Sequence, residues 1–398
     1  MSAPSSSPST PGHATDQSNE KELNQSNEEQ LDQSNEEQPD QRNEEQLDQR
    51  YEEALAMRIG GLPPQVRDAI LGTVAFPRPE LALTAISPDP RRDHLVEHFL
   101  VQPFPSSAVH SSMGILEALL ISNASGVLLQ LDIQSYWNLR QVSRRARHVA
   151  SDIHRYRVVA QVARDVMRAM LRCGIAKHVR VIDLYDALAS SICRFCDDNI
   201  GDFLFMPQVS RCCFACLQSS PRLDMVNLDE VKFCRGQKTS LKLFRRLFPV
   251  LRTLPGSYSM EQISNVTRSH IAPKSLASEP LAAELGMKPG EIDMIEDPLG
   301  RYAASIRFPF FDMVTSYVQR GVYCKGCYVA SRNPGNPACA ASAARLRDGS
   351  TRLYTERGFM RHFLTCSNAI RLWKYSERER RIVGRPTLDL VPYVIGDE

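Results

Sequence analysis

The chain has 398 residues, 42% of them hydrophobic and 24% charged, with a net charge of +2. A chain of this length is too long to fold around one typical hydrophobic core, so we predict two or three small domains. Because no stretch reaches the roughly 18 apolar residues of a membrane span, and no signal-peptide core comes after the polar N-terminus, we expect a cytoplasmic or nuclear protein with no membrane contact.

The first 55 residues form an acidic tail. They carry 14 acidic and three basic residues, a net charge of −11, so the rest of the chain carries +13. Residues 16–55 repeat an octapeptide, for example at 40–47. A period of eight matches neither helical repeat, and one apolar position per repeat cannot bury a core. We therefore predict that residues 1–55 are disordered.

Helices are predicted along much of the chain up to the first cysteine pair. Residues 56–110 are rich in proline and predict a transitional segment of short helices and loops. Apolar spacing predicts helices over 113–150 and one amphipathic helix over 156–173, which Gly174 ends. Residues 183–188 predict a further helix.

After the first cysteine cluster the predicted elements are shorter. Residues 241–248 predict a basic helix that Pro249 stops. Residues 270–300 are predicted to be mainly loops. A charged helix is expected around 371–381, and a short charged tail comes after it.

Two CxxC pairs, sixteen residues apart, make up the first cluster. Its members are Cys193, Cys196, Cys213 and Cys216. Each short turn presents two thiolates, and tetrahedral zinc accepts four, so the spacing is typical of a zinc-knuckle pair. The apolar stretch 200–207 predicts a hairpin strand over the metal, and we expect Arg194 and Arg211 to offset the thiolate charge. Cys212 could replace Cys213, and a set of inert buried cysteines is the alternative.

A second cluster lies further along the chain. Its members are Cys324, Cys327, His362 and Cys366. Gly326 stands where a knuckle needs a tight turn, and on a predicted helix His362 and Cys366 share a face because they are four residues apart. A knuckle plus such a pair matches the ligands of finger-type zinc sites. Cys339 is a reserve ligand; the alternative is a surface histidine beside a core thiol.

The two clusters are predicted to bind two separate zinc ions, because 107 residues lie between Cys216 and Cys324. Closed four-ligand sites stabilise a fold and leave no open coordination position. The chain also has no phosphate-binding glycine loop, paired zinc histidines flanking a glutamate, or nucleophile elbow. We therefore expect a non-enzymatic protein with two structural zinc ions.

Residues 127–147 resemble the second half of an F-box. They contain an apolar helix, a Leu131-Asp132 turn and a second helix, and they end with the sequence Val142-Ser-Arg-Arg. The rest of the chain up to about residue 375 is similar to a family of F-box proteins from filamentous fungi. The motifs that carry this likeness are the Asp183–Leu188 helix, both CxxC pairs, Phe203-Leu-Phe205, Arg211-Cys-Cys-Phe-Ala-Cys-Leu217, Leu254-Pro-Gly-Ser-Tyr258 and Gly358–Cys366. The likeness covers roughly residues 113–375. The usual Leu-Pro opening with an acidic residue is absent at 122–126.

The resemblance implies a mainly α fold: F-box-like helices, then a helical body with two zinc-knuckle sites and short β-hairpins. The predicted segments are a disordered tail (1–55), a transitional segment (56–110), an F-box-like motif (111–155), a helical segment with the four-cysteine site (156–260), a second region with the Cys-Cys-His-Cys site (261–375) and a charged tail (376–398).

The resemblance also implies a substrate receptor of a SKP–cullin–F-box ubiquitin ligase, which binds a SKP-family adaptor and an unidentified protein substrate. Four residues would contact the adaptor or form the core beneath that contact: Leu128, Leu131, Leu139 and Val142. One alternative is a zinc-dependent nucleic-acid-binding protein, although the basic clusters lack interleaved aromatic residues. The other is a decayed F-box paralogue that no longer binds the adaptor.

Overall fold

The structure is a computed structural model, and it describes residues 60–77, 114, 126–233, 240–257, 265–266, 268–332 and 348–383. The chain divides into two units, Met1–Leu62 and Pro63–Glu398. The predicted disordered tail 1–55, most of the predicted helices before residue 126, and the reserve ligand Cys339 lie outside the described residues.

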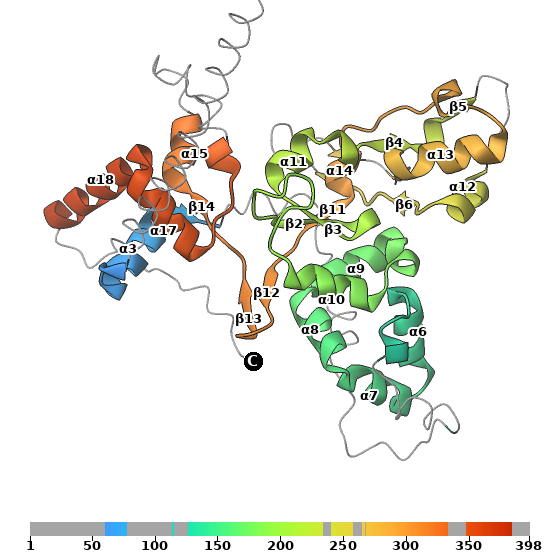
Figure 1. Ribbon diagram of the computed structural model, residues 1–398, viewed down its shortest axis with the longest axis horizontal. Helices are drawn as coiled ribbons and strands as arrows, with labels where there is room; N and C mark the ends of the chain where they lie inside the picture. Colours follow the sequence, from blue (N-terminus) through green and yellow to red (C-terminus); the bar gives the residue numbers. More distant parts are fainter. Residues whose placement is uncertain are drawn as a thin grey trace, which may run out of the picture. The chain divides into compact units, whose positions relative to one another are not determined.

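Helices dominate the described residues, which confirms the predicted mainly α fold (Figure 1). Five come one after another: α6 (Ile133–Val142), α7 (Arg144–Asp152), α8 (His154–Val162), α9 (Arg164–Cys173) and α10 (Val181–Ala189). The carboxylate of Asp132 accepts a hydrogen bond from the Ser135 amide, and the Ser143 hydroxyl accepts one from the Ala146 amide. These caps satisfy free backbone donors, so local sequence determines where α6 and α7 begin.

The single helix predicted over 156–173 is wrong, because α8 and α9 are separated at Ala163. This residue has φ −108° and ψ 26°, outside the helical region. Buried residues continue at helical spacing across the break, from Tyr156 in α8 to Met170 in α9. The spacing of apolar residues in the sequence therefore does not reveal the break at Ala163. As predicted, Gly174 ends α9, with a left-handed φ of 82°.

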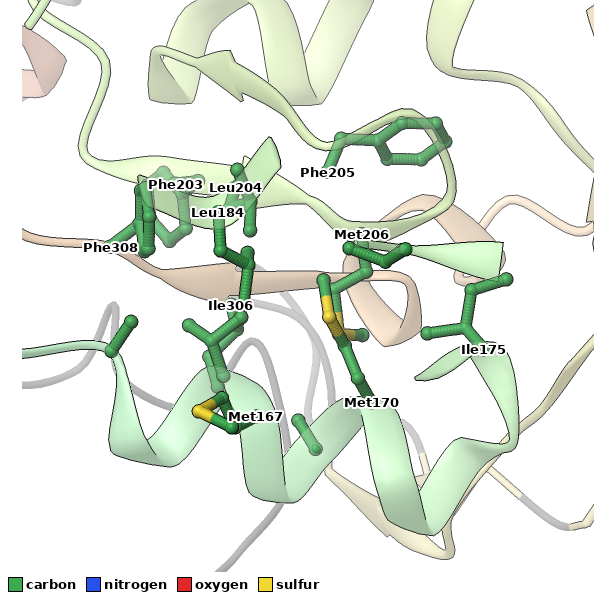
Figure 2. Packing of buried hydrophobic residues seen from close by; sticks show 14 of the residues in the cluster. Met167, Met170, Ile175, Leu184, Phe203, Leu204, Phe205, Met206, Ile306 and Phe308 are labelled. Carbon is green, nitrogen blue, oxygen red and sulfur yellow. The ribbon is translucent and has the colours of Figure 1, made fainter. Parts of the chain in front are cut away.

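An antiparallel sheet packs with these helices in the main core. Its order is β11-β2-β3, formed by β11 (Ser305–Arg307), β2 (Phe203–Phe205) and β3 (Ser210–Cys212). Phe203 lies opposite Cys212, and every residue of β2 is fully buried. Figure 2 shows Met167 and Met170 of α9 in the same core as Ile306 of the sheet. The predicted hairpin strand within 200–207 is confirmed.

A second, separate core lies around another sheet. Its order is β4-β9-β6, formed by β4 (Met225–Asn227), β9 (His270–Pro273) and β6 (Leu251–Arg252), with α12 (Leu241–Leu247) and α13 (Lys274–Leu285) packed nearby. The basic helix predicted over 241–248 is confirmed by α12.

The prediction of loops over residues 270–300 is wrong for their first half, which forms β9 and α13. Pro280 lies inside α13 and cannot donate a backbone hydrogen bond there. However, Ala277 and Leu281, four residues apart, are both fully buried in the second core. The helix persists because this burial outweighs the hydrogen bond that Pro280 cannot donate.

The C-terminal cysteine region contains β14 (Tyr323–Cys324), α15 (Lys325–Ser331), α17 (Glu356–Thr365) and α18 (Ser367–Val383). An N-terminal segment belongs with it: α3 (Pro64–Val74) leads into β1 (Ala75–Phe76), which pairs antiparallel with β14. Ala75 lies opposite Cys324 and Phe76 opposite Tyr323. The charged helix predicted around 371–381 lies within α18.

The described part also contains five 3-10 helices and these short elements: α11 (Phe214–Ser219), α14 (Gly300–Ala303), β5 (Lys232–Phe233), β7 (Gly256–Ser257), β8 (Asn265–Val266), β10 (Ile292–Asp293), β12 (Phe310–Asp312) and β13 (Tyr317–Gln319). The main core contains Leu128, Phe205 and Tyr323. These come from the predicted segments 111–155, 156–260 and 261–375, so those three segments share one core.

Candidate metal centres

The four cysteines of the first cluster lie around one point. Cys193 and Cys196 lie in the loop after α10, Cys213 is the N-cap of α11, and Cys216 lies in the first turn of that helix. Their sulfur atoms all lie within 4.8 Å of one another, and those of Cys196 and Cys213 are 3.9 Å apart. A disulfide needs a sulfur–sulfur distance of about 2.0 Å, so these cysteines are free thiols.

The second cluster draws on three elements. Cys324 ends β14, Cys327 lies in the first turn of α15, His362 lies in α17, and Cys366 comes directly after α17. The four ligand atoms again lie within 4.8 Å of one another. The Cys327 sulfur is 3.4 Å from His362 Nε2 and 3.5 Å from the Cys366 sulfur. The structure therefore brings together both ligand sets that the spacing predicts.

These distances suit a tetrahedral ion. If sulfur binds such an ion at about 2.3 Å, neighbouring ligand atoms lie roughly 3.8 Å apart. The separations of 3.9, 3.5 and 3.4 Å are close to that value. Each cluster can therefore hold its own metal ion, with four protein ligands and no open coordination position for a substrate.

Backbone amides donate hydrogen bonds to sulfur in both clusters. The donor–acceptor pairs are Phe195 to Cys193, Cys216 to Cys213, Cys327 to Cys324 and Ala369 to Cys366, at 3.4 to 3.5 Å. Hydrogen bonds to the charged form of a thiol favour that form. The local backbone is thus arranged for thiolate, the form of cysteine that binds metals.

Neighbouring groups shift the pKa values of Cys193 and Cys216 in the first cluster in opposite directions. A hydrogen bond from Cys213 lowers the pKa of Cys193 to about 5. Burial, and then the charge on Cys193, raises the pKa of Cys216 to about 12. The charge on Cys193 thus opposes ionisation of Cys216, and a divalent metal bound between them would supply the positive charge that offsets it.

Tyr354 orients the histidine of the second cluster. Its hydroxyl lies 3.3 Å from His362 Nδ1, and the two rings stack with centroids 4.7 Å apart. With Nε2 directed at the sulfurs, the remaining proton of a neutral imidazole resides on Nδ1, where the tyrosine oxygen accepts it. Tyr354 lies outside both cysteine motifs, so sequence reasoning missed it.

The structure answers the question of register between Cys212 and Cys213. Cys213 belongs to the cluster. Cys212 is the last residue of β3 and is completely buried, and burial raises its pKa well above the usual value. Because successive side chains of a strand point to opposite faces, neighbouring cysteines cannot exchange places without a slip of the hairpin.

The expected role of Arg211 in offsetting thiolate charge is wrong. Its guanidinium is buried and donates hydrogen bonds to the carbonyl oxygens of Gly201, Phe308 and Pro309 at 2.7 to 2.8 Å. It also lies over the Phe308 ring, 4.7 Å from the centroid. Arg211 thus ties the β2–β3 hairpin to the chain after β11.

Gly326 has a different role from the predicted tight turn. It lies within α15, where a Cβ atom would stand 2.5 Å from the Ala369 backbone nitrogen and 2.7 Å from the Asn368 carbonyl carbon. Its φ is not positive. The glycine therefore permits α18 to approach α15 closely, which brings Cys366 to Cys327.

A buried polar contact joins the two cysteine regions. Tyr323, which precedes the ligand Cys324, donates a hydrogen bond to Asp202, which lies in the loop that leads from the first knuckle into β2. Arg307 lies 3.8 Å from the same carboxylate and donates to the Pro77 carbonyl. Tyr323 and Asp202 are separated by 121 positions in the sequence, so no local motif predicts the hydrogen bond between them.

The Asp197 backbone is strained in the first knuckle. Asp197 comes directly after Cys196 and has a φ of 54°, in the left-handed region that favours glycine. We expect Asp197→Gly to raise the free energy of unfolding by about 0.5–1 kcal/mol, because the strain is relieved. Asp198→Gly is the control, since its φ is not positive; urea unfolding that shows equal gains for both variants would contradict this account.

The four predicted adaptor residues differ in exposure. Leu128 is buried in the main core, Leu131 and Leu139 are partly buried against it, and Val142 is 75% exposed at the end of α6. Val127, the first residue of the stretch 127–147 that resembles an F-box, is also exposed. Within residues 127–147, the side chains of Val127 and Val142 are therefore available to a partner.

Within the described ranges, no helix combines the length and apolar character needed to cross a bilayer. Comparison with protein-family models, with curated proteins and with solved structures found no match.

Proposed function

We propose that this chain is a non-enzymatic, F-box-like substrate receptor of a cullin-type ubiquitin ligase, with two structural zinc ions. The observation that carries the metal assignment is the assembly of two complete four-ligand clusters, one of four cysteines and one of three cysteines and a histidine. Sulfur-rich tetrahedral sites of this kind suit zinc, and the closed ligand shells suit a structural role.

The helical segment with α6 and α7 supports the adaptor part of the proposal. A single residue, Ser143, links its two helices, because it ends one and caps the other. The segment buries Leu128 in the main core yet leaves Val142 in solvent. An apolar side chain at the exposed end of a rigid helix pair is what an adaptor groove would bury. The zinc-containing body would then hold the substrate, which raises its effective concentration near the conjugating enzyme.

The test is co-purification of the full chain with a SKP-family adaptor. We expect a one-to-one complex, and we expect Val142→Asp to weaken it at least about tenfold, since a charge would enter an apolar contact. Val142 is the better target than Leu131 or Leu139, because those two side chains also contact the core.

Val314→Asp is the matched control. Val314 is 93% exposed between β12 and β13, so the same charge enters an exposed valine outside the F-box-like segment. If both variants bind the adaptor equally well, Val142 is not an adaptor contact. A folded, zinc-loaded chain that ignores the adaptor would favour the decayed paralogue, and steep salt-dependent binding to generic DNA would favour the nucleic-acid-binding alternative.

A further inference from the structure

The eight ligands of the two clusters differ in their access to solvent. In the second cluster Cys324, Cys327 and Cys366 are at most 8% exposed. In the first cluster Cys193 and Cys213 are buried, Cys216 is half-buried, and Cys196 is exposed. Among the cysteines in the described part of the chain, Cys196 alone is exposed to solvent.

The local fold explains this exposure. Cys196 ends the first knuckle and precedes Asp197, whose left-handed backbone turns the chain. Its sulfur contacts the Asn199 side-chain nitrogen at 3.8 Å and the Cys213 sulfur at 3.9 Å. Cys213, by contrast, joins β3 to α11 inside the main core. One edge of the first cluster thus faces solvent while its opposite edge lies in the core.

We propose that Cys196 is a modification site, through which peroxide and soft electrophiles attack the first metal centre and release its ion. The inference rests on the proposed zinc assignment. Thiol reactivity requires both thiolate character and access. Metal binding would make every ligand cysteine of both clusters a thiolate. Among these ligand cysteines, Cys196 is the most accessible to solvent.

The peroxide reaction takes two steps. The Cys196 sulfur attacks one oxygen of hydrogen peroxide, the O–O bond breaks, and the departing hydroxide takes a proton to become water. The Cys213 sulfur then attacks the resulting sulfenic acid, an S–S bond forms, and the second oxygen leaves as water with a second proton from solvent. The two sulfurs lose two electrons, peroxide gains them, and zinc is released because two ligands are gone.

The experiment treats the full-length, zinc-loaded chain with equimolar N-ethylmaleimide, and separately with hydrogen peroxide, in the presence of a chromogenic zinc chelator. Metal content before treatment tests the zinc assignment by itself. We expect one zinc to leave at least about tenfold faster than the other, since reactivity depends on access. Among the seven ligand cysteines, peptide mass mapping at early times should place the first maleimide on Cys196.

Cys196→His is the informative variant, because it keeps a zinc ligand and removes the nucleophile. It should hold two zinc ions and release the first at least about tenfold more slowly than the natural chain. Cys216→His, at the half-buried ligand of the same centre, should leave the fast release in place. A chain that holds two zinc ions but loses them together, or takes its first maleimide on another of the seven ligand cysteines, would overturn the proposal, whether or not the variants fold.

Discussion

Cys213→Ser is expected to reduce the zinc content from two ions per chain to one and to unfold the middle of the chain. Cys213 is 4% exposed, caps α11 through its sulfur and comes directly after the central hairpin. Metal binding and folding are coupled in such sites, and losing a ligand should lower the free energy of unfolding by about 3 kcal/mol or more. Elemental analysis and thermal melting measure the two effects.

Cys212→Ser is the control for this variant. Its side chain is equally buried, but it lies outside the metal cluster. We expect two zinc ions to remain and a loss of only about 1–2 kcal/mol, since a hydroxyl replaces a thiol in an apolar site. Equal zinc loss in both variants would mean that the β2–β3 hairpin has a different register.

Gly326→Ala is expected to destabilise the C-terminal cysteine region strongly. Alanine favours a helix over glycine by about 1 kcal/mol, so propensity alone predicts a gain. The added Cβ would stand 2.5 Å from a backbone nitrogen of Ala369, and a backbone cannot rotate away as a side chain can. Overpacking of this kind costs about 1–3 kcal/mol or more, so the clash outweighs the propensity.

The same clash should affect the second metal centre. Separation of α15 from α18 would move Cys327 from Cys366, whose sulfurs lie 3.5 Å apart. The variant should therefore lose one zinc ion and melt at a lower temperature. Gly290→Ala is the control, since nothing lies within 4 Å of its added Cβ and its φ is not positive. If Gly326→Ala keeps both ions and melts like the control, the close approach of these helices is wrong.

Some features depend only on nearby residues, and those were predictable from sequence. The two sets of ligands follow from spacing, because a CxxC turn places both thiols on one side whatever surrounds it. Gly174 ends α9 because glycine adopts the left-handed conformation without strain. The hairpin strand within 200–207 is predictable from a short apolar run between turns.

Other predictions failed where distant contacts prevailed over local signals. Residues 270–300 were predicted to be mainly loops, but burial of Ala277 and Leu281 in the second core maintains α13. Arg211 next to two cysteines suggested a counter-charge, but its guanidinium binds carbonyl oxygens up to 98 positions away in the chain. Periodicity and spacing describe neighbours in sequence and carry no record of such contacts.

The sequence by itself therefore determined the helical class of the chain and which residues can gather as ligands, since both depend on interactions within a few residues. Only the tertiary structure decided which ligand faces solvent, that β1 supports β14, that Tyr354 orients His362, and that Gly326 admits α18. Each of these depends on how elements pack against one another, and packing is specified by the whole chain at once.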